Sequence, residues 1–514
     1  MWDKKIFDRL HHKKAQSVIG GGEKRIEKQH ASGKLTARER LEILFDKDTF
    51  VEVGGLIESR ITDFGLEDKK VPGDGVVVGY GKVNGKLVFA SSEDFTVIGG
   101  TLGEYHSLKI CRIMDMALET GAPFVSINDS GGARIEEGIC SLSGYSGIFY
   151  RNTQLSGVVP QISVILGPCA GGACYSPAIS DFIFMSKQTS LMFITGPGVV
   201  KAVTGETVSS ADLGSADVHM TKSGVTHFVY DDDEQCLMGV RKLLSYLPQS
   251  SQSKADSISP TYTNTCDDMQ EIVSDNQKKP YNVKLVIEKI IDDGSFFEIQ
   301  PDFAKNIVVG FSRINGDTVG IVANQPAFLG GAIDCDSADK AARFIRFCDC
   351  FNIPIVTLVD VTGFLPGQKQ EHSGIIRHGA KLLFAYSEAT VPKISLILRK
   401  AYGGAYIAMN SKNMGADVVF AWPIAQMAVM GAEGAVDIIF KREIAGSENP
   451  AEKRQLLIEE YENKFANPYI AAARGYVDEI IEPQDSRQRI IMALDMLKTK
   501  KQENPHKKHG NIPL

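Results

Sequence analysis

The chain has 514 residues, of which 43% are apolar and 23% charged, and its formal net charge is −7. This length exceeds what one hydrophobic core supports, and the negative balance argues against a nucleic-acid-binding surface. No apolar run approaches the roughly 20 residues of a membrane span, and the charged start lacks the apolar core of a signal peptide. We therefore expect a cytoplasmic protein of two domains that binds no nucleic acid.

The nine cysteines form neither a metal-binding nor a disulfide pattern. None belongs to a C-x-x-C motif, and none is paired with histidines at zinc-binding spacing. Several lie in apolar segments, where a free thiol behaves as a small hydrophobic side chain. We expect reduced structural cysteines and no metal in this chain.

Charged helices open the chain, and short strands follow them. Residues 1 to about 50 have spaced apolar positions, typical of solvated helices that pack on something larger. Thr36, with Glu39 three residues later, predicts a helix start with a capping box. The next expected elements are strands at Val76–Val78 and Leu87–Ala90, a helix at Tyr105–Thr120 and a strand at Phe124–Ile127.

A Ser-rich stretch flanked by prolines divides the chain into two parts. We expect an N-terminal domain over residues 1–250, a linker over 251–280 and a C-terminal domain over 281–514. The second domain is expected to end in charged helices from Pro450 to Lys498. Residues 499–514 are then expected to fray.

The second domain repeats the first. The segment Pro160–Ala173 matches Pro392–Ala405 at an offset of 232 residues, and both end in Gly-Gly-Ala. The segments that begin at Val77 and Val308 match at an offset of 231, and a third pair shares that offset. An offset this constant indicates an internal duplication of one α/β domain, with helices covering a sheet. Neither copy contains a G-x-G-x-x-G or P-loop fingerprint, so we expect neither NAD chemistry nor ATP hydrolysis.

Each copy carries a Gly-Gly pair between a strand and a helix, Gly171–Gly172 and Gly403–Gly404. Glycines leave backbone N–H groups uncovered at the start of a helix, where they can bind an anion or stabilise an oxyanion. One such pair is more often only a tight turn. Its duplication suits a reaction in which two carbonyl oxygens gain negative charge. Further glycine turns flank the pairs, at 129–134 and 195–198 in the first copy and at 360–364 and 430–434 in the second.

These segments carry a family resemblance that covers nearly the whole chain. Its most specific motifs are SGGARIEEG at 130–138, GPCAGGA at 167–173, DVTGFLPG at 360–367, RKAYGGA at 399–405 and Trp422-Pro423. The chain resembles the carboxyltransferase subunits of biotin-dependent acyl-CoA carboxylases and decarboxylases, of the propionyl-CoA carboxylase beta and methylmalonyl-CoA decarboxylase alpha types. The resemblance implies two tandem crotonase-like domains and a hexamer built from dimers. It also implies that the N-terminal domain binds acyl-CoA and the C-terminal domain binds biotin.

The resemblance assigns roles to residues by position. The amides that would stabilise charge are those of Gly171, Gly172 and Ala173 on the thioester oxygen and those of Gly403, Gly404 and Ala405 on the biotin ureido oxygen. Contacts with the substrates are implied for Gly131, Gly132, Ala133, Arg134, Tyr175, Ile407, Gly363, Phe364 and Glu433. No side-chain base is required, because the biotin ureido nitrogen can take the proton itself.

Three positions qualify these assignments. In propionyl-CoA-preferring members an Asp commonly follows the Tyr of Gly-Gly-Ala-Tyr, whereas this chain has Ile407. This departure weakens propionyl-CoA as the unique substrate and favours the decarboxylase branch. Asp360, directly before a glycine turn, is expected to cap that turn. Glu433 lies near glycines and is a candidate for the crevice.

We expect a carboxyltransferase that moves a carboxyl group between carboxybiotin and a short-chain acyl-CoA, with propionyl-CoA and methylmalonyl-CoA as the leading pair. The chain has no Ala/Val-Met-Lys-Met biotinylation motif, so the biotin carboxyl carrier protein would be a separate chain. A biotin carboxylase subunit or a membrane decarboxylase subunit would be the other partner, set the direction of the reaction and provide any membrane association. The alternatives are a biotin-independent crotonase-type hydratase or isomerase, which needs one oxyanion site, and a non-catalytic scaffold.

Overall fold

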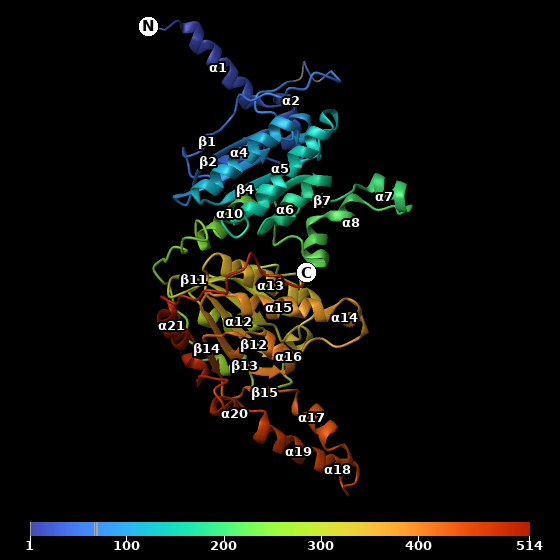
Figure 1. The fold of residues 1–514 in the computed structure, drawn as a ribbon, viewed down its shortest axis with the longest axis vertical. Coiled ribbons are helices and arrows are strands. Elements are labelled where there is room, and N and C mark those ends of the chain that lie inside the picture. The colour runs from blue at the N-terminus through green and yellow to red at the C-terminus, as the bar shows by residue number, and fades with distance from the viewer. Residues whose placement is uncertain (1, 66, 68–69) are drawn as a thin grey trace. The chain divides into compact units, whose positions relative to one another are not determined.

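The structure is a computed structural model that describes residues 2–65, 67 and 70–514 (Figure 1). The chain forms two compact units, Met1–Lys254 and Ala255–Leu514. Each unit has its own sheet and its own hydrophobic core.

The first unit is built on an eight-stranded sheet in the order β1-β2-β3-β4-β5-β6-β8, with β7 beside β5. The pairings from β1 to β3 are antiparallel, and those from β3 to β8 are parallel. The strands are β1 (Val51–Glu52), β2 (Val76–Val83), β3 (Lys86–Glu93), β4 (Phe124–Ser130), β5 (Gln161–Ala170), β6 (Phe182–Ser186), β7 (Leu191–Phe193) and β8 (Phe228–Tyr230). β4 and most of β5 are buried, as parallel strands covered by helices are.

Some helices of the first unit cover its sheet, and others, such as the first and the seventh, project away from it (Figure 1). The helices are α1 (Lys4–Ile19), α2 (Glu23–Ala31), α3 (Ala37–Leu44), α4 (Glu104–Thr120), α5 (Ile139–Leu155), α6 (Tyr175–Ile179), α7 (Pro197–Thr204), α8 (Ser210–Gly214), α9 (Ala216–Val218) and α10 (Asp233–Tyr246). α4 packs beside α5 (Figure 1) and lies on β2 and β3. α3 packs against α10. The capping box of Thr36 and Glu39 is confirmed at the start of α3, and α4 confirms the helix expected at Tyr105–Thr120.

The second unit repeats this architecture. Its eight-stranded sheet has the order β16-β14-β13-β12-β11-β10-β9, with β15 beside β13, so each strand has a counterpart in the first unit. The strands are β9 (Phe297–Ile299), β10 (Ile307–Ile314), β11 (Asp317–Asn324), β12 (Ile355–Val361), β13 (Lys393–Tyr402), β14 (Val418–Ala421), β15 (Gln426–Ala428) and β16 (Glu479–Ile480). The topology confirms the internal duplication.

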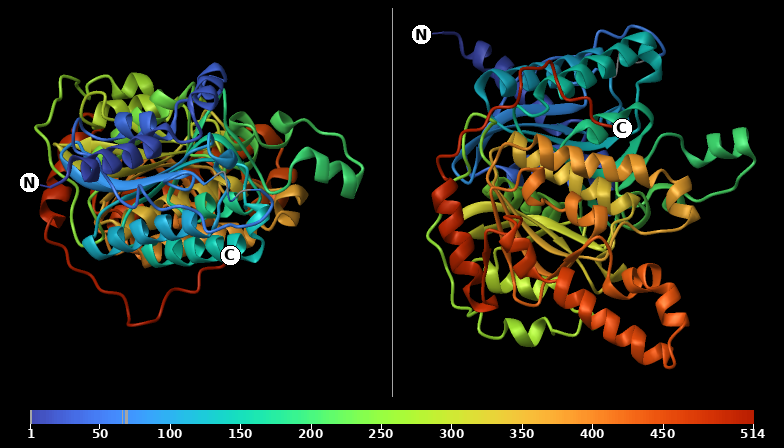
Figure 2. Two further views of the ribbon diagram at one scale, coloured as in Figure 1. Left: turned by 90° about the horizontal axis from the view of Figure 1, so that it is seen from above. Right: turned by 60° about the horizontal axis from the view of Figure 1, so that its bottom comes forward.

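The helices of the second unit include a long pair on the sheet, α13 and α15, which lie side by side as α4 and α5 do (Figure 2, orange). The helices are α11 (Met269–Ile272), α12 (Val283–Ile290), α13 (Cys335–Cys350), α14 (Gln368–His372), α15 (Ile375–Glu388), α16 (Gly403–Ala408), α17 (Ala432–Ile439), α18 (Lys441–Ala445), α19 (Pro450–Phe465), α20 (Pro468–Ala473) and α21 (Ser486–Leu497).

A clamped hairpin joins β2 to β3 in the first unit. Its two-residue loop, Asn84-Gly85, has positive φ at both residues, which is the type I′ turn that suits the twist of a hairpin. Asp46 accepts hydrogen bonds from both loop amides, and Arg241 donates to Asp46 at 2.8 Å.

The second unit has the same clamp on the hairpin between β10 and β11. The loop is Asn315-Gly316, again with positive φ at both residues. Asp292 accepts hydrogen bonds from both amides, and Arg487 donates to Asp292 at 2.6 Å. The duplication therefore extends beyond the matched segments to a side-chain network.

Two segments expected to be loosely held are attached to the second unit. Within residues 251–280, the helix α11 forms, and Cys266 and Met269 join the hydrophobic core of this unit. The tail after residue 498 has no regular structure, but Asn504 donates to the carbonyl oxygen of Glu388 at 2.7 Å and Lys507 pairs with the Glu388 carboxylate. The expectation that residues 499–514 fray is therefore wrong.

Candidate functional site

A glycine turn follows the central strand of each unit. β5 runs into the 3-10 helix η4 (Gly171–Cys174), and β13 runs into α16. Gly171 has a φ of 64° and Gly403 a φ of 59°, a left-handed conformation that glycine adopts without strain. The expected order of strand, glycine pair and helical turn is confirmed at both places.

In the first unit a second loop lies beside the glycine turn. β4 and β5 pair in parallel up to Ser130 opposite Cys169, so the loops that follow both strands leave the sheet at the same edge. A Cβ on Gly132 would stand 3.0 Å from the carbonyl oxygen of Ala170. The two loops can therefore approach this closely only because position 132 has no side chain.

These loops leave two backbone amides unpaired. Leu102 bridges the second loop through the Gly132 carbonyl and the Arg134 amide, which leaves the intervening amide of Ala133 out of the bridge. Among the described residues, the amides of Ala133 and Gly172 donate to no acceptor. Both residues are partly exposed, so an oxygen atom of a ligand can reach them.

The second unit presents the same arrangement after β12 and β13. The loop after β12 forms the corresponding bridge to Ile333. Within the part of the chain that the structure describes, the amides of Phe364 and Gly404 donate to no acceptor. A Cβ on Gly404 would meet only the Phe364 ring, at 3.8 Å, and nothing lies within 4 Å of a Cβ on Gly363.

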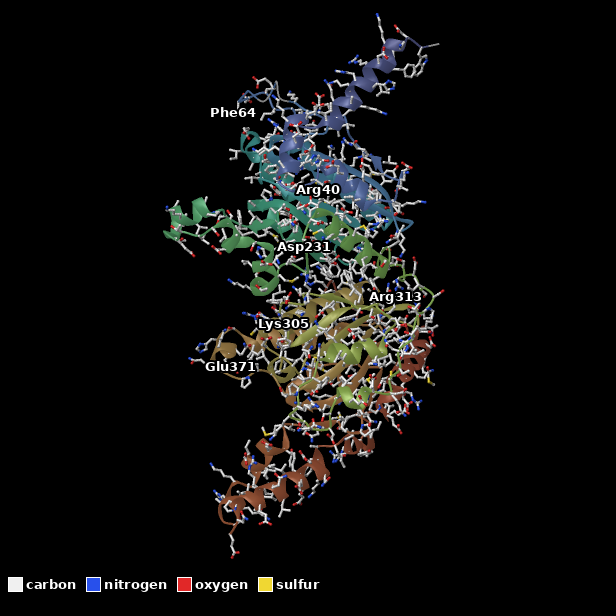
Figure 3. All side chains as sticks on the ribbon, turned by 180° about the vertical axis from the view of Figure 1, so that it is seen from behind. Arg40, Phe64, Asp231, Lys305, Arg313 and Glu371 are labelled. Atoms are coloured by element: carbon white, nitrogen blue, oxygen red, sulfur yellow. The ribbon has the colours of Figure 1, made fainter. Side chains whose placement is uncertain are left out.

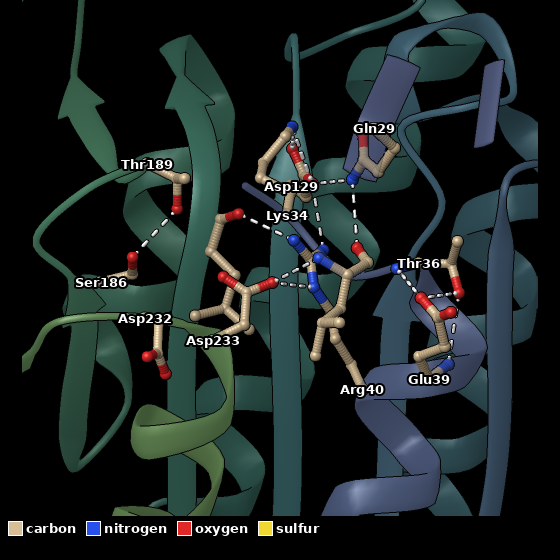
Figure 4. Close-up of polar contacts among 12 residues, drawn as sticks. Gln29, Lys34, Thr36, Glu39, Arg40, Asp129, Ser186, Thr189, Asp232 and Asp233 are labelled. Atoms are coloured by element: carbon tan, nitrogen blue, oxygen red, sulfur yellow. Dashed lines mark hydrogen bonds and ion pairs between the residues drawn. The ribbon is translucent and has the colours of Figure 1, made fainter. Parts of the chain in front are cut away.

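Behind the loops of the first unit, a buried carboxylate, Asp129, binds three side chains of the N-terminal segment (Figure 4). Arg40 Nη1 donates at 3.0 Å, Lys34 Nζ at 2.9 Å and Gln29 Nε2 at 3.0 Å. Arg40 is fully buried inside the unit (Figure 3) and also binds Asp233 at 2.8 Å. Buried charges need such partners, so residues 29–40 support the site from inside the unit. The sequence predicted only solvated helices for this segment.

In the second unit the counterpart of this carboxylate, Asp360, is held by its neighbouring strand. It accepts hydrogen bonds from Arg399 Nε at 3.0 Å and from the amide of Lys400 at 3.2 Å. Arg399 Nη1 also donates to the carbonyls of Asn276 and Lys279, which ties that segment to the end of β13. Burial raises the pKa of Asp360, and the charge of Arg399 opposes that shift. The expectation that Asp360 caps its own glycine turn is wrong, because its oxygens serve β13.

Arg134, expected among the substrate contacts, is fully buried. Its Nη1 donates to Asp74 at 2.8 Å and to Glu137 at 2.6 Å, and its Nη2 donates to the carbonyl of Thr101. The guanidinium therefore holds the loop 131–133 from inside, and we assign Arg134 no direct contact with a substrate.

Three other predicted contact residues lie at the surface. Tyr175 and Ile407 each follow a glycine turn and are 49% and 46% exposed. Glu433 pairs with the exposed Lys278 at 2.8 Å, and this pair lowers the pKa of its carboxyl. Glu433 is thus a solvated carboxylate with a counterion.

Sequence reasoning missed three buried polar residues behind the loops of the first unit. Glu93, at the end of β3, accepts a hydrogen bond from the amide of Asp129 at 2.9 Å, and His106 lies buried on α4. The ring of Tyr145 stands 3.3 Å from where a Cβ on Gly172 would lie. No motif marks these residues. Their only signals are a carboxylate that ends an apolar strand and a histidine on the buried face of a helix.

Two negative findings concern the described ranges 2–65, 67 and 70–514. No three His, Cys, Asp or Glu side chains in these ranges gather in a way that could hold a metal ion. None of the helices in the same ranges combines the length and the apolar character needed to cross a bilayer.

Fold and site together define a class of enzyme. Two α/β domains, each with a glycine turn beside an unpaired amide, are suited to stabilise negative charge on carbonyl oxygens. The family model of the carboxyl transferase domain matches residues 28–512. The chain belongs to this family, and it is an acyl-CoA carboxyltransferase with a two-domain crotonase-like fold.

Individual relatives agree with this assignment. Methylmalonyl-CoA decarboxylase subunit alpha of Propionigenium modestum is 56% identical over 519 residues, which cover 99% of each chain. The propionyl-CoA carboxylase carboxyltransferase subunit of Haloferax mediterranei is 56% identical over 510 residues, with the same coverage. The crystal structure of the transcarboxylase 12S hexamer with methylmalonyl-CoA bound has a TM-score of 0.97 to this chain at 53% identity, covering 100% of this chain and 99% of that one.

Proposed function

We propose that this chain moves a carboxyl group between biotin on a separate carrier protein and a short-chain acyl-CoA of the propionyl/methylmalonyl type. The observation that carries the proposal is the unpaired amide pair in each unit, Ala133 with Gly172 and Phe364 with Gly404. Acyl-CoA would bind at the first pair and biotin at the second. A hydratase or isomerase with one oxyanion site would leave the second pair without a role.

The first amide pair suits the oxygen of a thioester. Removing a proton or carbon dioxide next to a thioester carbonyl places negative charge on its oxygen. Fixed N–H donors stabilise that charge by about 3–4 kcal/mol each. Gly172 would donate from the glycine turn, with Gly171 and Ala173 beside it. Ala133, expected only as a contact, would be the second donor, and Gly132 lets the two loops approach.

The second amide pair would hold the ureido oxygen of biotin by the same means. When bound, carboxybiotin would supply the carboxyl group and biotin would accept it. The residues present fit that oxygen, because Gly404 has no side chain beside its amide and the Phe364 ring is the group that a Cβ at this position would meet, at 3.8 Å. Gly403 and Ala405 would lie in the same turn, and Gly363 leaves the neighbouring loop open.

The substrates and partners follow from the relatives. Those that match over almost their whole length are named for methylmalonyl-CoA or propionyl-CoA, and the transcarboxylase 12S structure is a hexamer. We therefore include in the proposal a hexamer of this chain, a biotin carboxyl carrier protein, and either a biotin carboxylase or a membrane decarboxylase subunit. The last of these would set the direction of the reaction. Within the chain, the domain limits 1–250 and 281–514 remain predictions.

The purified chain is expected to transfer the carboxyl group of methylmalonyl-CoA to added free biotin, without ATP, added metal or nicotinamide. The products are propionyl-CoA and carboxybiotin, and free carboxybiotin then breaks down to biotin and carbon dioxide. The reason is that backbone amides provide the stabilisation in both units. The measurement is carbon dioxide release with and without biotin, in the presence of a chelator. A strict requirement for ATP would contradict the proposed function.

Changing Ile407 to Asp is expected to shift the relative kcat/KM values for acetyl-, propionyl- and butyryl-CoA by roughly 10- to 100-fold. Ile407 is 46% exposed beside the second glycine turn. In the proposed hexamer this turn would face the first unit of a partner subunit, so Ile407 would wall the acyl group bound there, and one apolar pocket contact is worth about 1–3 kcal/mol. Ile258→Asp, at a 53% exposed position elsewhere in the second unit, is the matched control. Unchanged substrate ratios in Ile407→Asp would remove this residue from the acyl pocket.

A further inference from the structure

We propose that Glu93 and His106 form a neutral, proton-sharing pair that positions both loops of the first unit, with Glu93 as a protonated acid whose hydroxyl is directed at His106 Nε2. Neither residue would touch a substrate. The assignment of the proton rests on the hydrogen-bonding geometry around both side chains and on their burial, and only its effect on turnover rests on the proposed function.

The hydrogen bonds of His106 define which of its nitrogens carries the proton. Nδ1 lies 3.0 Å from the carbonyl oxygen of Asp74, and since a carbonyl only accepts, Nδ1 must donate. Nε2 is then an acceptor, and it is one of the buried polar atoms without a partner among the described residues. Burial, together with the charges of Arg134 and Lys109, holds the pKa of His106 well below its usual value. His106 is therefore neutral and lacks one donor.

Glu93 supplies the missing donor. Its Oε2 accepts the Asp129 amide at 2.9 Å, and its Oε1 lies 3.8 Å from His106 Nε2. Burial raises the pKa of Glu93 to about 8, although the Asp129 amide favours the charged form. At neutral pH the carboxyl thus carries a hydrogen, and Nε2 is the acceptor in front of it. A small rotation of the Glu93 side chain, or a bridging water, would close the remaining gap between Oε1 and Nε2.

Charged and polar groups from several elements face this pair, and the charge of Asp129 raises the pKa of Glu93 whereas that of Arg40 lowers it. The groups are Asp129 on β4, Arg40 on α3, Lys109 on α4, Tyr145 on α5, Cys169 on β5, and Asp74 and Arg134 in loops. Asp129 already forms ion pairs with Arg40 and Lys34. A second carboxylate next to it would compete for the same guanidinium, so the proton on Glu93 avoids two buried charges of like sign.

Both loops of the first unit rest on this pair. Glu93 holds the amide of Asp129, and the following residue, Ser130, accepts the Gly132 amide at 3.1 Å. Glu93 and Tyr145 also line one cavity of about 20 Å³, room for a single water molecule. The hydroxyl of Tyr145 has no partner within the described ranges, and its ring backs Gly172.

The second unit contains a neutral version of the same device. The residue 231 positions after Glu93 is Asn324, whose Oδ1 accepts the Asp360 amide at 3.3 Å. Its Nδ2 donates to the carbonyl of Gly331 at 3.3 Å. An amide has the shape and the donor–acceptor pattern of a protonated carboxyl. The same position thus accepts one backbone amide and donates one hydrogen in both units.

The direct test is infrared spectroscopy of the full-length protein in D₂O from pH 6 to pH 10. At neutral pH we expect the carbonyl stretch of a protonated carboxyl. This band should disappear with a midpoint near pH 8 and should be absent in Glu93→Gln. Glu119→Gln, at an exposed position on the same helix as His106, should keep the band. A wild-type spectrum with no carboxyl band that titrates between pH 7 and 9 overturns the proposal, whether or not the variant folds.

Stability and turnover provide a second readout. The pKa of folded Glu93 lies above its unfolded value, so the stabilisation from its proton is complete below about pH 4.5 and is lost as the pH rises to about 8. Glu93→Gln has no such loss, and its Tm should exceed that of the wild type by about 5 °C or more at pH 8 but not at pH 5. The kcat/KM of the wild type should decline above pH 8, where Glu93 loses its proton. The kcat/KM of Glu93→Gln should not decline there. Identical pH profiles in both proteins would overturn the positioning role. A wild-type protein that shows the infrared band but no carboxyl transfer would count against the proposed function alone.

Discussion

Replacing Gly404 by valine is expected to slow carboxyl transfer by roughly 100- to 1,000-fold, the effect of losing one oxyanion donor. Gly404 does not have positive φ, and its Cβ would meet only the Phe364 ring at 3.8 Å, so the fold can accept the side chain. The valine methyls would occupy the space that a ligand oxygen needs in front of both amides. Biotin or the biotinylated carrier, and not acyl-CoA, should lose affinity.

Gly172→Val is the reciprocal change in the first unit, where a CoA analogue should lose affinity instead. Its Cβ would stand 3.3 Å from the Tyr145 ring, so a loss of stability must be measured separately. Gly171 and Gly403 are unsuitable for this test, because a valine at their positive φ would strain the backbone. Gly198→Val, with nothing within 4 Å of its Cβ, is the control. If both variants lose affinity for the same ligand, the proposal of two oxyanion sites is wrong and a mechanism with a single oxyanion site replaces it.

Changing Arg399 to Met is expected to lower the free energy of unfolding of the second unit by about 3–5 kcal/mol, because it leaves a buried carboxylate without its counterion. Asp360 is fully buried, and the Lys400 amide would remain on one of its oxygens. The two carbonyls that Arg399 Nη1 satisfies would lose this donor as well. The measurement is urea unfolding of the intact chain, followed by a probe in the second unit.

The loss in Arg399→Met should depend on pH. Without the guanidinium, the pKa of folded Asp360 lies further above its unfolded value, so stability is present at low pH and is lost as the pH rises. The variant should therefore be closer to the wild type at pH 4 than at pH 8, and adding Asp360→Asn should recover part of the loss. Arg454→Met breaks an exposed pair with Asp437 and should lower the free energy of unfolding much less than Arg399→Met does. Equal losses in the two single variants would show that the buried pair contributes little.

The elements that sequence predicted well are those specified by local chemistry. The glycine turns, the helix from Glu104 to Thr120 and the capping box of Thr36 each follow from residues a few positions apart. The duplication was visible because matched segments kept a constant offset. These features required no knowledge of which parts of the chain meet in space.

The support behind the site could not be predicted in this way. Helical periodicity assigns a charged residue such as Arg40 to solvent, whereas its partner lies 89 residues away on β4. Asp360 and Glu93 resemble turn or surface carboxylates until β-sheet pairing places them beside Arg399 and His106. The donor roles proposed for Ala133 and Phe364 likewise depend on two β-bridges that join distant segments.

The two buried arginines, Arg399 and Arg40, differ in how far along the chain their carboxylate partners lie. During synthesis on a ribosome, that separation corresponds to a time. Asp360 and Arg399 are 39 residues apart, whereas Arg40 precedes Asp233 by 193. At about 5–20 residues per second, synthesis covers the first interval in about 2–8 s and the second in about 10–40 s. In the nascent second unit, Asp360 can thus pair with Arg399 within seconds of its own synthesis. A ribosome stalled before residue 233 would hold a first unit whose arginine has only one of its two counterions.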